Sequence, residues 1–195
     1  GHSDSDGFLV NASVTQSNLF GTGKELAVSF SNTQSTTNFN VRYSDPYYTS
    51  EGISRGFNAY STTTDAAQAG TAAYNTESQG VGVFYSIPLT EDNRIHLGAD
   101  IERINIETTS SSAQIAQDFV ADNGPSNTSL KATISWTKDT LDSALAPSSG
   151  TLQRITGELS VPGSDIQYYK ITYLAGRYWP IGERSAFKLK AELGF

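Results

Sequence analysis

Residues 95–102 have the sequence IHLGADIE, in which apolar side chains occupy every second position. The apolar members are Ile95, Leu97, Ala99 and Ile101. Successive side chains of a β-strand point to opposite faces, so this period of two predicts a strand with one apolar and one polar face. After Ile101 the apolar phase shifts by one residue, to Ile104 and Ile106, which indicates either a β-bulge or the end of the apolar band.

The same alternation recurs along the rest of the chain. It is found in residues 10–15, 25–30, 39–43, 53–59, 80–87, 130–136, 155–161, 169–175 and 187–195. Together with residues 95–102, these segments predict about ten strands and an all-β fold. Hydrophobic residues are 37% of the chain, below the usual share of about 45%, yet aromatic residues reach 11%. This composition is explained by strands that have one apolar face and one polar face.

The connections between these segments fall into two alternating classes. The compact class, marked by Gly or Pro, comprises residues 20–23, 45–52, 88–93, 139–150 and 180–184. The polar class comprises residues 31–37, 62–78, 108–127 and 162–165, and two of its members are long. Within the third of these, residues 113–121 predict a short helix with Ile115, Phe119 and Val120 on one face.

Compact turns at one end of a meander and longer polar loops at the other are typical of an outer-membrane β-barrel. Lipid offers no hydrogen-bond partner, so backbone groups must pair between strands. The sequence therefore predicts an antiparallel up-and-down meander of about ten strands that forms a transmembrane β-barrel, partial or re-closed. The predicted membrane-facing residues are Val10, Val28, Phe30, Val41, Val83, Leu97, Ile134, Leu159, Ile171 and Leu189. The predicted interfacial aromatics, which lie beside the compact turns, are Phe20, Tyr47, Tyr48, Tyr178 and Trp179.

The composition excludes several classes of protein. The chain has 195 residues and no cysteine, so it has no disulfide framework and no thiolate metal site. Its net charge of −7 argues against a nucleic-acid partner. It contains no run of about 20 apolar residues that would predict a transmembrane helix, and no secretory signal at its start.

No catalytic, cofactor-binding or metal site is predicted. His96 shares the polar face of one strand with Asp100 and Glu102, and such groups could act as acid–base partners or metal ligands across a lumen. A solvated or internally paired barrel interior explains them better. Four arginines also lie in predicted strands: Arg55, Arg103, Arg154 and Arg177. Because an unpaired charge facing lipid is costly, we expect them to point inward and pair with carboxylates.

Several stretches occur together in an order that resembles a known family. They are NLFGTG at 18–23, SDPYY at 44–48, GISRG at 52–56, VPGSD at 161–165 and YYK at 168–170. The sequence PSSG at 147–150 also matches a Pro-containing turn of that family. Over about Ser3 to Phe195, the chain resembles the transmembrane barrel of the BamA family, the central subunit of the bacterial β-barrel assembly machinery.

The resemblance implies both a location and a role. The family barrel has roughly sixteen strands, so residues 1–195 are expected to be a single domain that forms part of it, with the periplasmic repeats and closing strands absent. The implied location is the bacterial outer membrane, and the implied role is folding and inserting β-barrel proteins without enzymatic chemistry. The implied partners are the lipid bilayer, unfolded outer-membrane proteins and other subunits of the machinery.

A partial sheet would expose two unpaired edges, which attract other strands. One hypothesis is that the chain closes into a smaller barrel, and another is that its edges pair with a second copy. Two functional alternatives remain open. The first is a small passive outer-membrane barrel or pore, and the second is a soluble β-sandwich that binds ligands through Tyr-rich loops.

Overall fold

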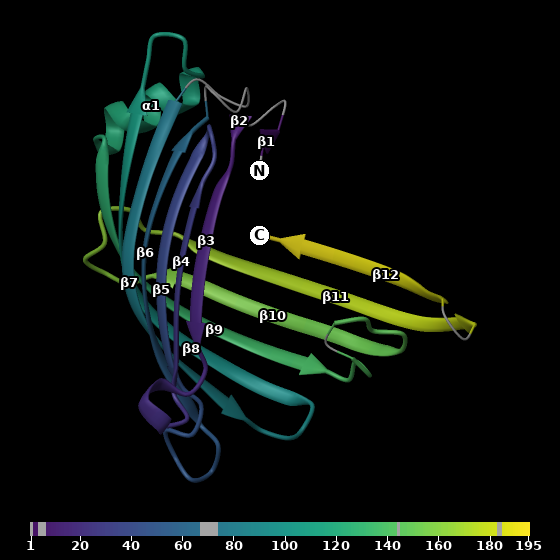
Figure 1. The fold of residues 1–195 in the computed structure, drawn as a ribbon. Helices are drawn as coiled ribbons and strands as arrows, with labels where there is room; N and C mark the ends of the chain where they lie inside the picture. Colours follow the sequence, from purple (N-terminus) through teal and green to yellow (C-terminus); the bar gives the residue numbers. More distant parts are fainter. Residues whose placement is uncertain (1, 4–6, 67–73, 144, 183–184) are drawn as a thin grey trace.

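A computed structural model describes residues 2–3, 7–66, 74–143, 145–182 and 185–195. Ten antiparallel strands form one curved sheet, in the order β12-β11-β10-β9-β8-β7-β6-β5-β4-β3 (Figure 1). The strands are β3 (Val10–Gln16), β4 (Glu25–Asn32), β5 (Thr36–Asp45), β6 (Ser54–Asp65), β7 (Tyr74–Pro88), β8 (Asn93–Thr108), β9 (Ser126–Asp139), β10 (Gly150–Ser160), β11 (Tyr169–Gly182) and β12 (Ser185–Gly194). Two short strands, β1 (His2–Ser3) and β2 (Gly7–Phe8), pair with each other.

Every strand of the large sheet pairs with its neighbours in sequence, which confirms the predicted up-and-down meander. The outermost strands, β3 and β12, do not pair with each other, so the sheet is open on both sides in the part of the chain described (Figure 1). The partial barrel is therefore the form present, and the hypothesis that the chain re-closes on itself is not supported.

The phase shift after Ile101 does not arise from a β-bulge. Pairing of β8 with β7 and β9 runs without a register shift through Ile104. The bulge interpretation is wrong, and the shift marks the end of the apolar band. Beyond it, Asn105 occupies a position on the formerly apolar face.

The two classes of connection lie at opposite ends of the strands. The compact turns include a 3₁₀ turn (Leu19–Gly21) between β3 and β4. At the other end, helix α1 (Gln114–Asn123) lies between β8 and β9 (Figure 1). It confirms the helix predicted at residues 113–121, although Ile115 on its predicted apolar face is 80% exposed.

The longest compact turn is organised by one carboxylate. Asp142 accepts hydrogen bonds from the backbone N–H groups of Ser148 and Ser149, at 2.9 and 3.1 Å, and from the Ser148 hydroxyl. Hydrogen bonds that favour the ionised form hold the pKa of Asp142 well below its ordinary value. The turn is therefore held by interactions local to residues 142–149.

Glycine on the concave side lets side chains of neighbouring strands lie against the backbone. A Cβ added at Gly56 would lie 2.1 Å from Phe84 Cζ and 2.6 Å from the Tyr43 carbonyl oxygen. Gly56, Phe84 and Gly98 lie opposite one another on β6, β7 and β8. At Gly98, in the same cross-strand row, the nearest atom to an added Cβ would be Thr133 Cβ, at 3.6 Å.

Gly56→Ala should therefore destabilise the protein far more than Gly98→Ala. The clash at Gly56 involves a backbone carbonyl as well as a ring, so we expect its free energy of unfolding to fall by about 2 kcal/mol. Gly98→Ala should change it by less than about 0.5 kcal/mol. Urea unfolding in detergent micelles measures both, and equal effects of the two variants would contradict the packing described for Phe84.

Candidate functional site

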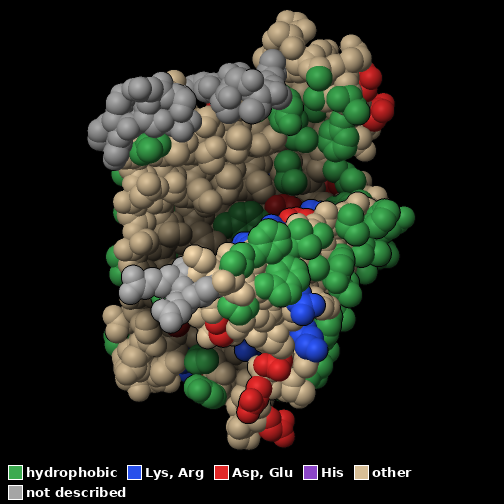
Figure 2. Space-filling model, turned by 90° about the vertical axis from the view of Figure 1, so that its right-hand side faces the viewer, with side chains coloured by type: hydrophobic (Ala, Val, Ile, Leu, Met, Phe, Trp, Pro, Cys, Tyr) green, Lys and Arg blue, Asp and Glu red, His purple; other side chains and the backbone are tan. Residues whose placement is uncertain are grey.

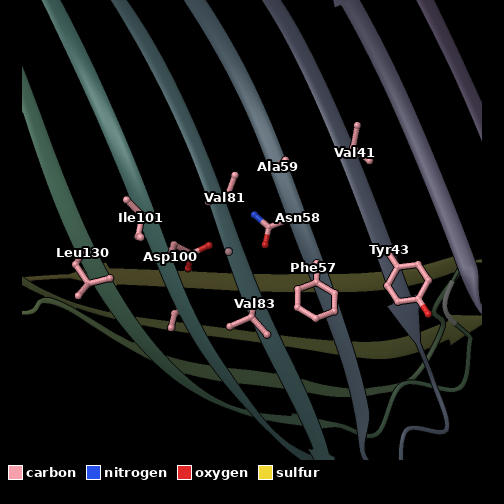
Figure 3. Close-up of a pocket in the computed structure, with 12 residues that line it drawn as sticks. Val41, Tyr43, Phe57, Asn58, Ala59, Val81, Val83, Asp100, Ile101 and Leu130 are labelled. Carbon is pink, nitrogen blue, oxygen red and sulfur yellow. The ribbon is translucent and has the colours of Figure 1, made fainter.

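The cross-strand register collects apolar side chains on the convex face of the sheet. One row across β3–β9 consists of Val14, Val28, Val41, Ala59, Val81, Ile101 and Leu130. The next row consists of Leu26, Tyr43, Phe57, Val83, Ala99, Ala132 and Leu159. Members of both rows lie side by side in Figure 3. These rows and their continuation on β9–β12 are called the apolar belt.

No second protein layer covers the apolar belt in the described residues. Ile134 and Leu189 are each 57% exposed. Among all the described residues, Ala66 is the one hydrophobic residue that is buried. All ten residues predicted to face the membrane occupy this face by register. Their contact with lipid remains a prediction.

The belt has a limited height. On β8 it runs from Ile95 to Ile101, and the polar side chains of Asn93 and Arg103 bound it on the same face. Ten residue steps of strand span roughly 34 Å. At a tilt near 45° the polar residues Asn93 and Arg103 are about 24 Å apart along the membrane normal, so the apolar residues between them fit within the apolar band of outer-membrane barrels, about 25 Å tall.

The expectation that all four strand arginines point inward and pair with carboxylates is wrong. Register places Arg55, Arg103 and Arg177 on the convex face, and only Arg154 on the concave face. Among the described residues, the ion pairs present involve other groups. The convex arginines lie at the edges of the belt, where a long side chain can reach water while its stem stays on apolar surface.

Aromatic rings accompany two of these arginines at the compact-turn edge of the belt. The guanidinium of Arg55 lies 3.9 Å from the Tyr48 ring centroid, and that of Arg177 lies 5.1 Å from the Trp179 centroid. Such cation–π contacts stabilise a partly desolvated cation.

The predicted interfacial aromatics do not all share one face. Phe20 and Tyr47 are 93% and 79% exposed at their turns. On β11, Trp179 packs against Phe187 on the convex face, with ring centroids 5.7 Å apart. Its neighbour Tyr178 lies on the concave face, where the Lys188 ammonium is 5.3 Å from its ring.

The concave face is polar and encloses a hollow. Figure 2 looks into this hollow, whose wall consists largely of side chains and backbone that are neither hydrophobic nor charged. Ser129, Ser135 and Thr137 on β9 are buried on this face. The sheet therefore separates an apolar exterior from a polar interior.

A hydrogen-bonded cluster on the concave face joins four neighbouring strands, β6–β9. Glu102 Oε1 accepts hydrogen bonds from the Tyr60 hydroxyl and from the Ser78 hydroxyl, the latter at 2.9 Å. Glu102 Oε2 accepts from the Lys131 ammonium at 2.7 Å, and both ends of this ion pair are 14% exposed. The sequence indicated the polar faces of these strands, but not the register that brings Lys131 to Glu102.

The three residues considered for acid–base or metal chemistry are on the concave face but do not converge. Glu102 belongs to the cluster with Lys131. Asp100 lies beside Gly82, where an added Cβ would be 1.8 Å from its Oδ1. His96 borders one depression of about 380 Å³ near Arg94 and Arg154 and shares another, of about 350 Å³, with Asp100, but Glu102 lines neither of them. No group of three or more His, Asp or Glu side chains suited to a metal ion is found in the described residues.

Comparison with known proteins identifies the family. The model of the Omp85 superfamily domain matches residues 18–195. The chain belongs to the Omp85 superfamily. It is 32% identical, over 96% of its length, to the outer membrane protein assembly factor BamA of Neisseria meningitidis serogroup B (strain ATCC BAA-335 / MC58). The alignment covers 25% of that relative, so this Omp85 chain spans a quarter of its length.

A solved structure supports the fold of this Omp85 chain. The crystal structure of BamA from Haemophilus ducreyi lacking POTRA domains 1-3 matches all of the chain and 40% of that protein, with a TM-score of 0.82 at 24% identity. The predicted BamA resemblance and all-β fold are confirmed, and the location is the bacterial outer membrane, as predicted. In the described residues, α1 is too short to cross a bilayer, and no other helix is a candidate to do so.

Removing Lys131 should destabilise the Omp85 sheet, because it leaves the Glu102 carboxylate partly buried without its cation. We expect Lys131→Met to lower the free energy of unfolding by about 2 kcal/mol. Lys190, which pairs with Glu192 at 3.1 Å and is 49% exposed, provides the control. Lys190→Met should cost less than about 0.5 kcal/mol. Urea unfolding in micelles that ranks the two variants equally would show that the cluster does not stabilise the wall.

Proposed function

We propose that this chain is a wall segment of an outer-membrane barrel that folds and inserts other β-barrel proteins into the membrane. The observation that carries the proposal is the 32% identity over nearly the whole chain to a protein named as an outer membrane protein assembly factor. Unfolded outer-membrane proteins and other subunits of an assembly machinery would then be its partners. Such a role needs no covalent chemistry, so the chain acts without catalysis.

The two faces of the sheet support a place in the bilayer. The apolar belt supplies side chains that lipid can solvate, and each of the strands β4–β11 pairs with a neighbouring strand on both sides. In this proposal the ten belt residues named above, from Val10 to Leu189, contact lipid. Residues 1–195 form one domain, a portion of a larger barrel.

The proposed assembly role would use the backbone groups at a strand edge. An edge strand presents a row of backbone donors and acceptors to any strand that approaches it. In the proposed function, strand edges and the perturbed bilayer around the belt promote folding of a client.

The alternatives fit less well. A soluble sandwich requires a second sheet packed over the apolar face, and the described residues contain one ten-stranded sheet and a separate two-stranded pair. A passive pore shares the fold, but it would conduct ions without accelerating the folding of another barrel.

Liposomes that contain the intact protein should fold a urea-denatured outer-membrane barrel several times faster than empty liposomes. Ile171→Lys, in the belt, should prevent productive insertion, because a lysine near the bilayer midplane costs about 2–4 kcal/mol. Thr172→Lys, the next residue and on the concave face, should retain most of the activity. Correctly inserted protein that conducts ions but does not accelerate folding would favour the pore and contradict the proposal.

A further inference from the structure

The apolar belt contains a depression at its centre. Its volume is about 580 Å³, and it lies across β5–β9 (Figure 3). Ala59 and Ala99 have much shorter side chains than Phe57 and Ile101 beside them. The belt is therefore hollowed where these alanines lie.

A second depression, of about 470 Å³, continues the first toward the loop end of the strands. The two share Ala59, Val81 and Ile101. The second is bordered by Gln79 and Arg103, which lie opposite each other on β7 and β8. The two depressions together form one groove, called the Arg103 groove. It is apolar at the centre of the belt and cationic at the end where Arg103 lies.

The guanidinium of Arg103 is available to a ligand. Arg103 is exposed, its Nε–H donates to the Ser126 hydroxyl at 2.9 Å, and it forms no ion pair within the described part of the chain. The nearby carboxylate of Glu77 accepts hydrogen bonds from the Gln79 and Asn105 amides, at 2.7 and 3.5 Å. An uncompensated cation beside hydrocarbon is costly unless an anion or water meets it.

We infer that the Arg103 groove binds a lipid with a phosphate headgroup. The phosphate lies against the Arg103 guanidinium, which presents several N–H donors suited to phosphate oxygens. One acyl chain follows the groove past Ile101 to Ala99. This path is about 14 Å of strand, or about 10 Å of depth at the tilt of about 45° used above, so the groove holds the headgroup-proximal part of the chain within one leaflet, about 15 Å deep.

The other convex arginines do not offer the same site. Arg55 and Arg177 are stacked on the rings of Tyr48 and Trp179, and neither borders the groove. Arg177 is therefore a matched control: it is also a convex arginine at the edge of the belt, but without a groove.

The inference rests on the proposed place of the belt in the bilayer, and it is tested on the intact protein in a neutral detergent. Native mass spectrometry would measure retention of phosphatidylglycerol and of diacylglycerol, which lacks the phosphate. The wild type should retain phosphatidylglycerol at least fivefold more strongly than diacylglycerol.

Arg103→Gln should remove most of this difference between the two lipids, and Arg103→Lys should keep part of it. Glu77→Gln should strengthen retention, because it removes a nearby negative charge.

Filling the groove tests the role of the acyl chain. Ala59→Leu should lower retention of phosphatidylglycerol severalfold with Arg103 in place. Excess inorganic phosphate should displace little of the lipid, since it cannot occupy the apolar part. Complete displacement by phosphate would mean that the anion alone is recognised, and it would overturn the inference.

Arg177→Gln should leave retention within twofold of the wild type. If it lowers retention as much as Arg103→Gln, the effect is general interfacial charge and the inference fails. Far-UV circular dichroism confirms that each variant is folded. A protein that still accelerates client folding but does not distinguish the Arg103 variants would overturn the lipid site and leave the proposed function standing.

Discussion

Backbone hydrogen bonding between sequential strands is the constraint on which the rest of the structure depends. Once β3–β12 pair in register, alternate side chains are committed to opposite faces. If the pairing register of β8 and β9 with their neighbours slipped by one residue, Leu97 and Ile134 would point into the hollow, and Glu102 and Lys131 would lie on the apolar face. The belt, the polar interior and the cluster around Glu102 all follow from this one register.

The two faces are stabilised in different ways. On the concave side, polar groups satisfy one another, as Tyr60, Ser78 and Lys131 do around Glu102. On the convex side, no protein layer covers the belt in the described residues, so its stability depends on the surrounding solvent. Hydrocarbon solvates such a surface well and water does so poorly, so under the proposed function the bilayer is part of the folded state.

Much of the fold could be predicted from the sequence because strand alternation is a local signal. Ile95 to Ile101 defines one strand by itself, and the same period marks the others. The helix between β8 and β9 was predicted from its apolar spacing. The register across the 108–125 connection could not be predicted, since alternation fixes which face a residue occupies but not its cross-strand partner. The contact of Lys131 with Glu102 was therefore missed.

The convex arginines show where a sound rule led to the wrong expectation. Arg55, Arg103 and Arg177 share the alternation phase of their apolar neighbours, so the sequence already indicated their face. The cost of burying charge in lipid suggested instead that they turn inward. That cost applies to the middle of the belt, whereas these residues lie at its edges, where rings or water meet the guanidinium.

Site-directed spin labelling at two adjacent residues tests the central claim most directly. Cysteines introduced singly at Ile134 and Ser135 of the intact membrane-inserted protein would carry the labels, since this chain has no cysteine of its own. A label at residue 134 should collide mainly with oxygen dissolved in lipid, and a label at residue 135 should not. If the label at 134 is shielded from oxygen or reached mainly by a water-soluble relaxation agent, the apolar belt does not face hydrocarbon and the account fails.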